Sequence, residues 1–182
     1  MREIEIKLKV KNLDSVASKL RNLGVVLSEP VVQKDTNFVH KDDIKWFEPL
    51  DSKWVYPRLR EEPGKPLTLT IKKPLKNESD CREHELHIDN ADELRSMMDM
   101  LDYKEGVTVQ KTRRTGTFQG YTLTLDEVIA LGDFVEIEQV VENGNAEKIQ
   151  EEMFRFAKDT FGLERDDSVM KGYDILMHEI SI

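Results

Sequence analysis

The sequence has one cysteine, no long apolar run and no glycine-rich phosphate loop. A single Cys81 excludes an internal disulfide and is typical of proteins in a reducing compartment. A bilayer-spanning helix needs about 20 apolar residues, and the chain opens in a strand rather than in an apolar signal core. Without a glycine-rich loop, P-loop chemistry is excluded. We therefore expect a cytoplasmic protein with no membrane partner.

The chain also lacks an excess of basic residues. Its 27 Lys and Arg against 36 Asp and Glu give a formal charge of −9, which argues against a nucleic-acid partner. Charged residues make up 35% of the chain, above the roughly 25% of an average domain. The 38% of hydrophobic residues still suffice for a core. At 182 residues, we expect one domain over 1–182.

Alternation of apolar and polar residues predicts strands along most of the chain. The predicted strands cover 2–10, 31–39, 54–62, 66–73, 81–88, two strands within 107–128 that reverse near Gly116 to Gly120, and 132–141. Helical spacing is found over about 14–23, 90–103 and 146–162, with a last helical segment in 167–180, and 40–53 is predicted to be a loop. Many antiparallel strands with few helices indicate an α+β fold with a large curved sheet or a closed barrel.

The polar face of these strands carries charge to an unusual degree. In the first strand Glu3, Glu5 and Lys7 share one face, and apolar residues occupy the other. The same alternation recurs on most of the predicted strands. The charged residues on this face are Glu3, Glu5, Lys7, Arg58, Arg60, Lys72, Glu83, Glu85, Lys111, Arg113, Asp126, Glu136 and Glu138.

Two interpretations of this charged face compete. A solvated sheet face carries charge in many antiparallel sheets, and this explains any single strand. Like charges at i and i+2 lie roughly 6–7 Å apart and do nothing for strand stability, so their repetition in acid pairs and base pairs favours a bound ligand. If the sheet closes, the charges point into a lumen, where they need compensation. A polyphosphate with a divalent cation satisfies both signs together.

Histidine and cysteine provide no competing site. His40, His84, His87 and His178 lack metal-ligand spacing, and His84 and His87 fall on opposite faces of their strand. We interpret all four as structural residues. Cys81 is interpreted as an inert strand residue rather than a nucleophile.

Several short motifs resemble those of the CYTH superfamily, the triphosphate tunnel metalloenzymes. In chain order they are EIEIK (3–7), QKDTNF (33–38), RLR (58–60), TIK (70–72), REHE (82–85), KTR (111–113), LTLDEV (123–128) and LGDFVEIE (131–138). One E-x-E-x-K motif alone is a weak signal, whereas eight motifs in order over nearly the whole chain are a strong one.

The resemblance implies an eight-stranded antiparallel closed β-barrel, or tunnel, with a charged lumen and flanking helices. It implies triphosphate binding by Arg58, Arg60, Lys72, Lys111 and Arg113. It implies Mg²⁺ or Mn²⁺ as the cofactor, held by Glu3, Glu5, Asp126, Glu136 and Glu138. It places Lys7, as the signature lysine, and the acid pair Glu83 and Glu85 in the catalytic set. The chain departs from the family pattern at Asn37, where an aromatic residue is common, and at Gly172, where serine often precedes Tyr173.

The resemblance leaves three functions open. The first is a class IV adenylyl cyclase-like enzyme that converts ATP to cyclic AMP and pyrophosphate. The second is a triphosphatase that hydrolyses thiamine triphosphate or inorganic triphosphate. The third is a non-catalytic polyphosphate-binding or nucleotide-binding module.

Trp46, Phe47 and Trp54 either pack a loop or mark the interface of a homodimer.

Overall fold

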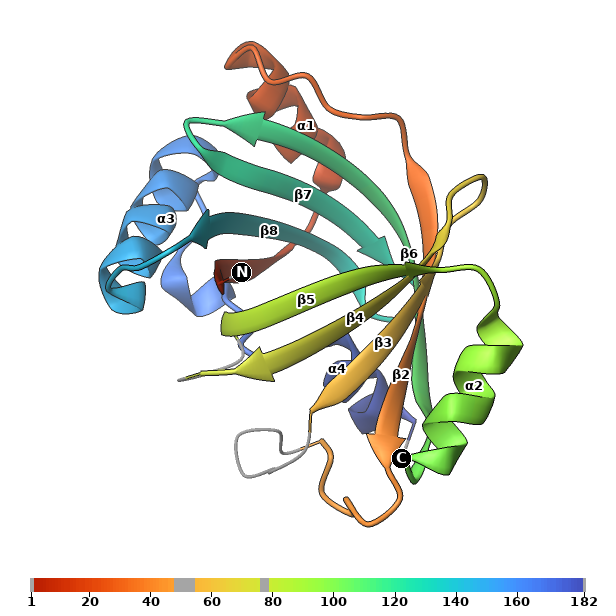
Figure 1. The fold of residues 1–182 in the computed structure, drawn as a ribbon. Helices are drawn as coiled ribbons and strands as arrows, with labels where there is room; N and C mark the ends of the chain where they lie inside the picture. Colours follow the sequence, from red (N-terminus) through yellow and green to blue (C-terminus); the bar gives the residue numbers. More distant parts are fainter. Residues whose placement is uncertain (1, 48–54, 76–78, 182) are drawn as a thin grey trace.

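Eight antiparallel strands close into a barrel in the computed structural model, which describes residues 2–47, 55–75 and 79–181 (Figure 1). The strands are β1 (Arg2–Val10), β2 (Val31–His40), β3 (Tyr56–Glu61), β4 (Leu67–Pro74), β5 (Asp80–Ile88), β6 (Tyr103–Phe118), β7 (Tyr121–Val128) and β8 (Gly132–Val141). Their order is β1-β5-β4-β3-β2-β6-β7-β8, and β8 pairs with β1 to complete the barrel. The predicted closed antiparallel barrel is confirmed.

Four helices accompany the barrel. They are α1 (Leu13–Asn22), α2 (Ala91–Met100), α3 (Ala146–Phe161) and α4 (Tyr173–Ile180). Asn12, Asn90 and Asn145 each accept a hydrogen bond from a backbone N–H of the first turn, the usual cap of a helix N-terminus. Within the described ranges, no helix has the length and apolar character that crossing a membrane requires.

The apolar faces of the strands point outward and are covered by helices. Ile4, Ile6 and Leu8 of β1 lie in a core with α1 and α3, while α2 places Leu94 and Met98 on a second core. The helical spacing predicted over 90–103 turns Leu94, Met97, Met98 and Leu101 inward, but Met97 and Leu101 are exposed. A helix on the outside of a barrel buries a narrow stripe, and Leu94 and Met98 at i and i+4 fill it.

The β6–β7 hairpin turns within the predicted range, at its C-terminal end. The turn lies at Gln119 and Gly120, with positive φ angles of 50° and 84°, as a two-residue hairpin turn requires. Gly116 instead lies inside β6, where an added Cβ would come within 2.7 Å of Val25. Glycine at position 116 therefore serves the close approach of the segment after α1.

A short seam joins β1 to β5. Among the described residues, three pairs are in register there, and one of them is Ile4 with Asp80. Both oxygens of the fully buried Asp80 accept hydrogen bonds from Arg2, at 2.7 and 2.9 Å. The Arg2 guanidinium also donates to the carbonyl of Gly144 at 3.0 Å. This bidentate pair stabilises the barrel where its ladder is shortest.

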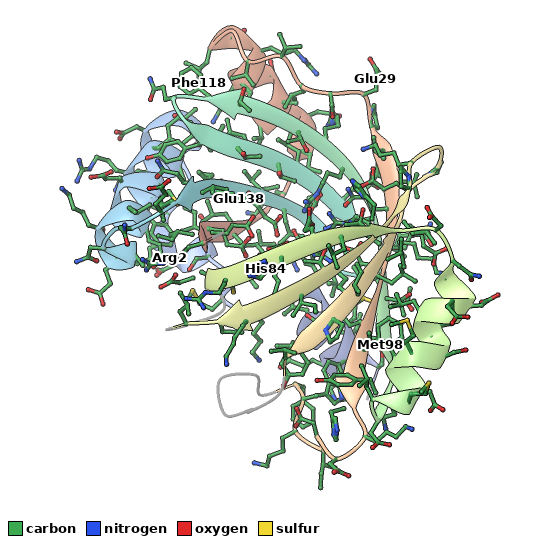
Figure 2. All side chains as sticks on the ribbon, viewed as in Figure 1. Arg2, Glu29, His84, Met98, Phe118 and Glu138 are labelled. Carbon is green, nitrogen blue, oxygen red and sulfur yellow. The ribbon has the colours of Figure 1, made fainter. Side chains whose placement is uncertain are left out.

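One part of the lumen is apolar. Val109, Val128 and Phe134 lie on the same strand faces as the charged residues, and they cluster with Tyr173 of α4. The helix α4 packs beside β6. Figure 2 shows the side chains that project into the rest of the interior, Glu138 of β8 among them. The lumen thus combines an apolar floor, to which α4 contributes, with a charged cavity.

Candidate functional site

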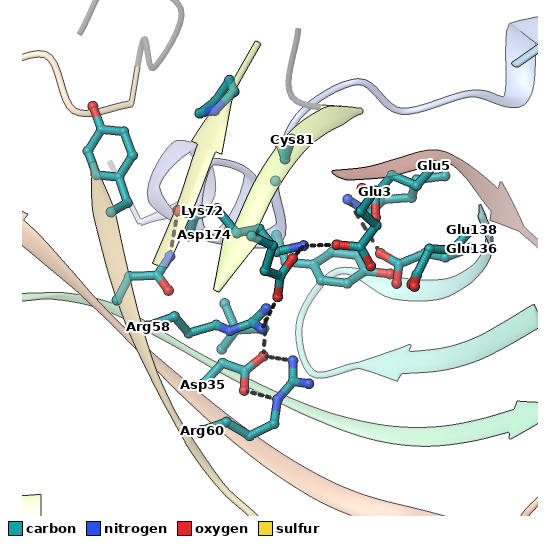
Figure 3. A pocket seen from close by; sticks show the side chains of 18 of the residues that line it. Glu3, Glu5, Asp35, Arg58, Arg60, Lys72, Cys81, Glu136, Glu138 and Asp174 are labelled. Carbon is teal, nitrogen blue, oxygen red and sulfur yellow. Dashed lines mark hydrogen bonds and ion pairs between the residues drawn. The ribbon is translucent and has the colours of Figure 1, made fainter. Parts of the chain in front are cut away.

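The barrel encloses a cavity of about 620 Å³ (Figure 3). Of the charged residues predicted to share one strand face, all except Asp126 line it. Closure of the barrel therefore brings the charged faces of the separate strands together as the wall of one cavity.

Acids outnumber cations where β1, β4 and β5 meet. The Lys72 ammonium lies 3.2 Å from a carboxylate oxygen of Glu3 and 2.7 Å from one of Glu83 (Figure 3). Burial raises the pKa of Glu3, and neighbouring Glu138 adds to the rise. Burial, followed by contact with Glu3, raises the pKa of Glu83 as well. One lysine does not compensate the negative charge of these carboxylates, so the group can bind a further cation.

On the opposite side of the cavity, Asp35 of β2 holds three cations. Arg60 donates to both of its oxygens at 2.7 and 2.8 Å, while Arg58 lies 3.9 Å away and Lys111 3.7 Å away. Burial opposes ionisation, but Arg58 and Arg60 hold the pKa of Asp35 well below its usual range. Asp35 is absent from the predicted set. The alternation of Gln33, Asp35 and Asn37 on β2 could have revealed it.

The structure places Asp126 beneath the cations rather than in the cavity wall. Its carboxylate is fully buried and accepts two hydrogen bonds from Arg113, one of them at 2.7 Å from Nε. Lys111 lies 3.4 Å away. Arg113 also donates to Glu136 at 2.7 Å, and Glu136 lies 3.5 Å from Lys7. Asp126 therefore orients basic side chains, a geometry different from that of a carboxylate facing the lumen.

Glu5 and Glu138 face each other in the register of β1 and β8. Neither carboxylate forms an ion pair with a described residue, although Lys72 and Lys7 attract Glu5 at longer range, and like charges directly opposite are destabilising. Their oxygens are the donor type that Mg²⁺ and Mn²⁺ prefer. In the described ranges, no three acidic, histidine or cysteine side chains are already gathered as a metal site. The donor chemistry fits such an ion, while Lys72 and Arg113 at present hold Glu3 and Glu136.

Asn37 and Tyr173 also line the cavity; the chain departs from the family pattern at the first and at Gly172, just before the second. The Asn37 amide donates to the Asp174 carboxylate at 2.5 Å, which ties β2 to α4 (Figure 3). The Tyr173 ring has the ammonium of Lys7 at 4.4 Å and that of Lys111 at 5.0 Å from its centroid. Tyr173 carries no charge and lies on a helix, so charge alternation along strands gave no signal for it.

Comparison with known proteins gives the family. The CYTH domain profile matches residues 1–173. The chain belongs to the CYTH family. A protein of Methanocaldococcus jannaschii named "Putative adenylate cyclase" is 28% identical over 178 residues, covering 95% of this CYTH chain and 97% of that protein.

Solved structures share the CYTH barrel. A conserved hypothetical protein from Pyrococcus furiosus has a TM-score of 0.77 at 26% identity, over 94% of this chain and 97% of the other. A protein from Hippeastrum, described as having a dominant triphosphatase activity, has a TM-score of 0.59 at 16% identity, over 87% of each chain. The second is a likeness of fold.

The histidines of this CYTH chain have different surroundings. His40 is buried and lies edge-on to Tyr103, with ring centroids 5.2 Å apart. His84 lines the cavity between Glu83 and Glu85 of β5. His178 of α4 stacks on Phe47 at 4.8 Å and lies 4.9 Å from Trp46.

The loop residues Trp46 and Phe47 thus pack within the chain. Trp54 lies outside the described residues, as do positions 48–53 of the loop predicted over 40–53. Cys81 lines the cavity as a buried thiol, and burial raises its pKa to about 12. A thiol in this state is protonated and a poor nucleophile.

Proposed function

We propose that this CYTH chain is a metal-dependent enzyme that binds a triphosphate in the barrel cavity. The observation that carries the proposal is the separation of incompletely matched charges within one cavity. Glu5 and Glu138 face each other and form no ion pair among the described residues, although Lys72 and Lys7 attract Glu5 at longer range. Arg58 keeps a buried Nε that has no hydrogen-bond partner among the described residues. A triphosphate with its metal ion supplies both missing partners, because it presents anionic oxygens and a divalent cation together.

Arg58 is the cation best placed to change partners. Its contacts with Glu83 and Glu85 are 3.8 and 3.9 Å long, beyond hydrogen-bond distance, and its 3.1 Å bond is to the neutral Thr70. Arg60 and Arg113 are held by bidentate carboxylates through Nε and Nη2. This fixes each guanidinium and leaves Nη1 for a phosphate oxygen. Lys72 and Lys111 complete the proposed phosphate-binding set.

Glu3, Glu5, Glu136 and Glu138 are the proposed ligands of Mg²⁺ or Mn²⁺. Asp126 is assigned instead to orienting Arg113 and Lys111, because it does not line the cavity. A bound metal ion would neutralise phosphate charge and polarise the reacting phosphoryl group. The residues of this chain would position the substrate, which is the main contribution of protein groups to phosphoryl transfer.

The first candidate reaction is that of an adenylyl cyclase. The ribose 3′-hydroxyl of ATP attacks the α-phosphorus, the bond to the β-phosphate oxygen breaks, and pyrophosphate leaves. Glu83 is the proposed acceptor of the hydroxyl proton, since its raised pKa makes it a stronger base than an ordinary glutamate. Lys7, which lies 3.5 Å from Glu136, and Glu85, which lies 3.9 Å from Arg58, complete the proposed catalytic set. Two observations support this candidate. The relative from M. jannaschii is named "Putative adenylate cyclase". The cavity lining also includes the uncharged residues Tyr56, Met170 and Ile175, which offer room for an adenine ring.

The second candidate is a triphosphatase for thiamine triphosphate or inorganic triphosphate. Water attacks the terminal phosphorus, the bond from this phosphorus to the bridging oxygen breaks, and orthophosphate leaves together with the remaining diphosphate, which is thiamine diphosphate or pyrophosphate. The dominance of charge in the cavity supports it, as does the triphosphatase activity of the Hippeastrum protein with the same fold.

Product identification separates the candidates. The protein is incubated with Mg²⁺ or Mn²⁺ and with ATP, thiamine triphosphate or inorganic triphosphate. Cyclic AMP with pyrophosphate supports the cyclase, and orthophosphate release supports the triphosphatase. Tight triphosphate binding without turnover indicates a binding module. Absence of both binding and turnover with all three compounds overturns the proposal.

A further inference from the structure

The hydroxyl of Tyr173 is a buried polar group without a partner. The side chain is 8% exposed, lines the charged cavity and begins α4. Within the part of the chain that the structure describes, no donor or acceptor forms a hydrogen bond with this hydroxyl. Buried hydroxyls in folded proteins nearly always have a partner, so its absence calls for a physical explanation.

Two cations lie beside the ring that carries this hydroxyl, each of them also close to a carboxylate, Glu136 for Lys7 and Asp126 for Lys111. The ammonium groups of Lys7 and Lys111 lie 4.4 and 5.0 Å from the ring centroid. Phe134 packs edge-on against the ring at 5.0 Å and fixes its position on the apolar floor of the lumen. An anion attracted by the two lysines therefore arrives beside Tyr173.

The hydroxyl is available as a donor. Burial raises the pKa of Tyr173 well above its usual value, and the charges of Glu136 and Asp126 raise it further. The group is therefore protonated at neutral and mildly alkaline pH, where a triphosphate is already highly anionic. A phosphate oxygen is an acceptor, so the two are complementary.

We propose that Tyr173 is a substrate-binding residue whose hydroxyl donates a hydrogen bond to a phosphate oxygen held by Lys7 and Lys111. The inference rests on the proposed triphosphate function and adds a contact from α4 to those from the strands. It also gives α4 a role beyond packing, since the first residue of this helix then closes the phosphate site from the floor of the lumen.

A purely structural tyrosine would behave differently on substitution. Tyr173→Phe keeps the ring, and with it the contacts to Phe134, Lys7 and Lys111, but removes the unpartnered hydroxyl. The ligand-free variant should therefore be as stable as the natural protein or more stable. If the hydroxyl binds substrate, the same variant should bind triphosphate more weakly than the natural protein does.

The experiment is isothermal titration with inorganic triphosphate in metal-free buffer, together with thermal unfolding of the ligand-free proteins. Tyr173→Phe should bind triphosphate about tenfold to a hundredfold more weakly, the usual effect of losing a hydrogen bond to a charged group. Its melting temperature should be unchanged or higher. Tyr121→Phe is the matched control, because Tyr121 packs against Phe156 and is not a cavity residue; its affinity should be that of the natural protein.

The outcomes separate this inference from the proposed function. Equal affinity of Tyr173→Phe and the natural protein, with Arg58→Ala weakened, overturns the inference and leaves the proposed function standing. A lower melting temperature with unchanged affinity shows a structural role. If the natural protein does not bind triphosphate under any of these conditions or with Mg²⁺ added, both fall.

Discussion

Asp35 of β2 lies opposite Arg60 of β3, and both of its oxygens accept hydrogen bonds from the guanidinium, at 2.7 and 2.8 Å. The same carboxylate lies within 4 Å of Arg58 and Lys111. One buried acid thus partly offsets the charge of three of the cations proposed to bind phosphate. In the ligand-free protein this carboxylate is their shared internal anion, and a triphosphate must compete with Asp35 for them.

Asp35→Asn tests this compensation. Removing one partner of a buried ion pair typically costs about 3–5 kcal/mol, so the melting temperature of the ligand-free variant should fall strongly. Inorganic triphosphate should restore more stability to the variant than to the natural protein, because the cations then lack their internal anion. Differential scanning fluorimetry measures both effects, with the exposed Asp159→Asn as control. Equal triphosphate-induced shifts in the two proteins would contradict the expectation.

Glu5→Gln tests the carboxylates proposed for the metal ion. Glu5 is a cleaner target than Glu136, since it holds no cation in the described ranges, whereas Glu136 contacts Arg113 and Lys7. The substitution removes both the repulsion with Glu138 and the longer-range attraction to Lys72, so the melting temperature should change little. The Mg²⁺ concentration for half-maximal activity should rise about tenfold or more, since even outer-shell changes cost this much. Unaltered Mg²⁺ dependence would remove Glu5 from the metal site. Glu127→Gln, at an exposed position of β7, is the control.

Arg58→Ala tests the phosphate contact. The guanidinium forms long contacts with acids, so its loss should change stability little while weakening triphosphate binding about tenfold or more. Calorimetric titration measures the affinity. Arg82→Ala is the matched variant, because Arg82 also lies on a barrel strand but is exposed. If both variants bind alike, Arg58 is not a substrate contact.

Lys111 gives the site a pH dependence. Burial, followed by repulsion from Arg113, lowers its pKa from 10.5 to about 8. Triphosphate affinity should therefore decline as the pH rises from 7 to 9, and binding near pH 8 should be accompanied by proton uptake, because the anion favours the ammonium form. Titrations in buffers of different ionisation enthalpy measure this uptake.

The same group gives an opposite dependence of stability. Between pH 8 and the unfolded value of 10.5, the unfolded chain keeps a proton on Lys111 that the folded state has lost. The contribution of this residue to the free energy of unfolding therefore increases with pH in that window. Lys111→Met should remove this contribution. A triphosphate affinity that is constant from pH 7 to 9 would contradict the low pKa.

Much of the barrel follows from local pattern. Glu3, Glu5 and Lys7 alternate with apolar residues, and an alternation of period two fixes which side chains share a strand face whatever the strand pairs with. The resemblance carried by the ordered motifs predicted that there are eight strands and that they close into a barrel. Asp35 was missed although Gln33, Asp35 and Asn37 obey the same rule, so that omission was not imposed by the sequence.

The sequence by itself determined the composition of the lumen, because the side of a strand on which a residue lies depends on its immediate neighbours. Tertiary structure decided the partner of each charge. Lys72 meets Glu3 because β4 and β1 flank β5, an order that no local pattern encodes. The tertiary structure also places Asp126 beneath Arg113 and brings Tyr173 of α4 to the lumen. The depth of a side chain and its long-range contacts depend on how the closed barrel packs around its apolar floor.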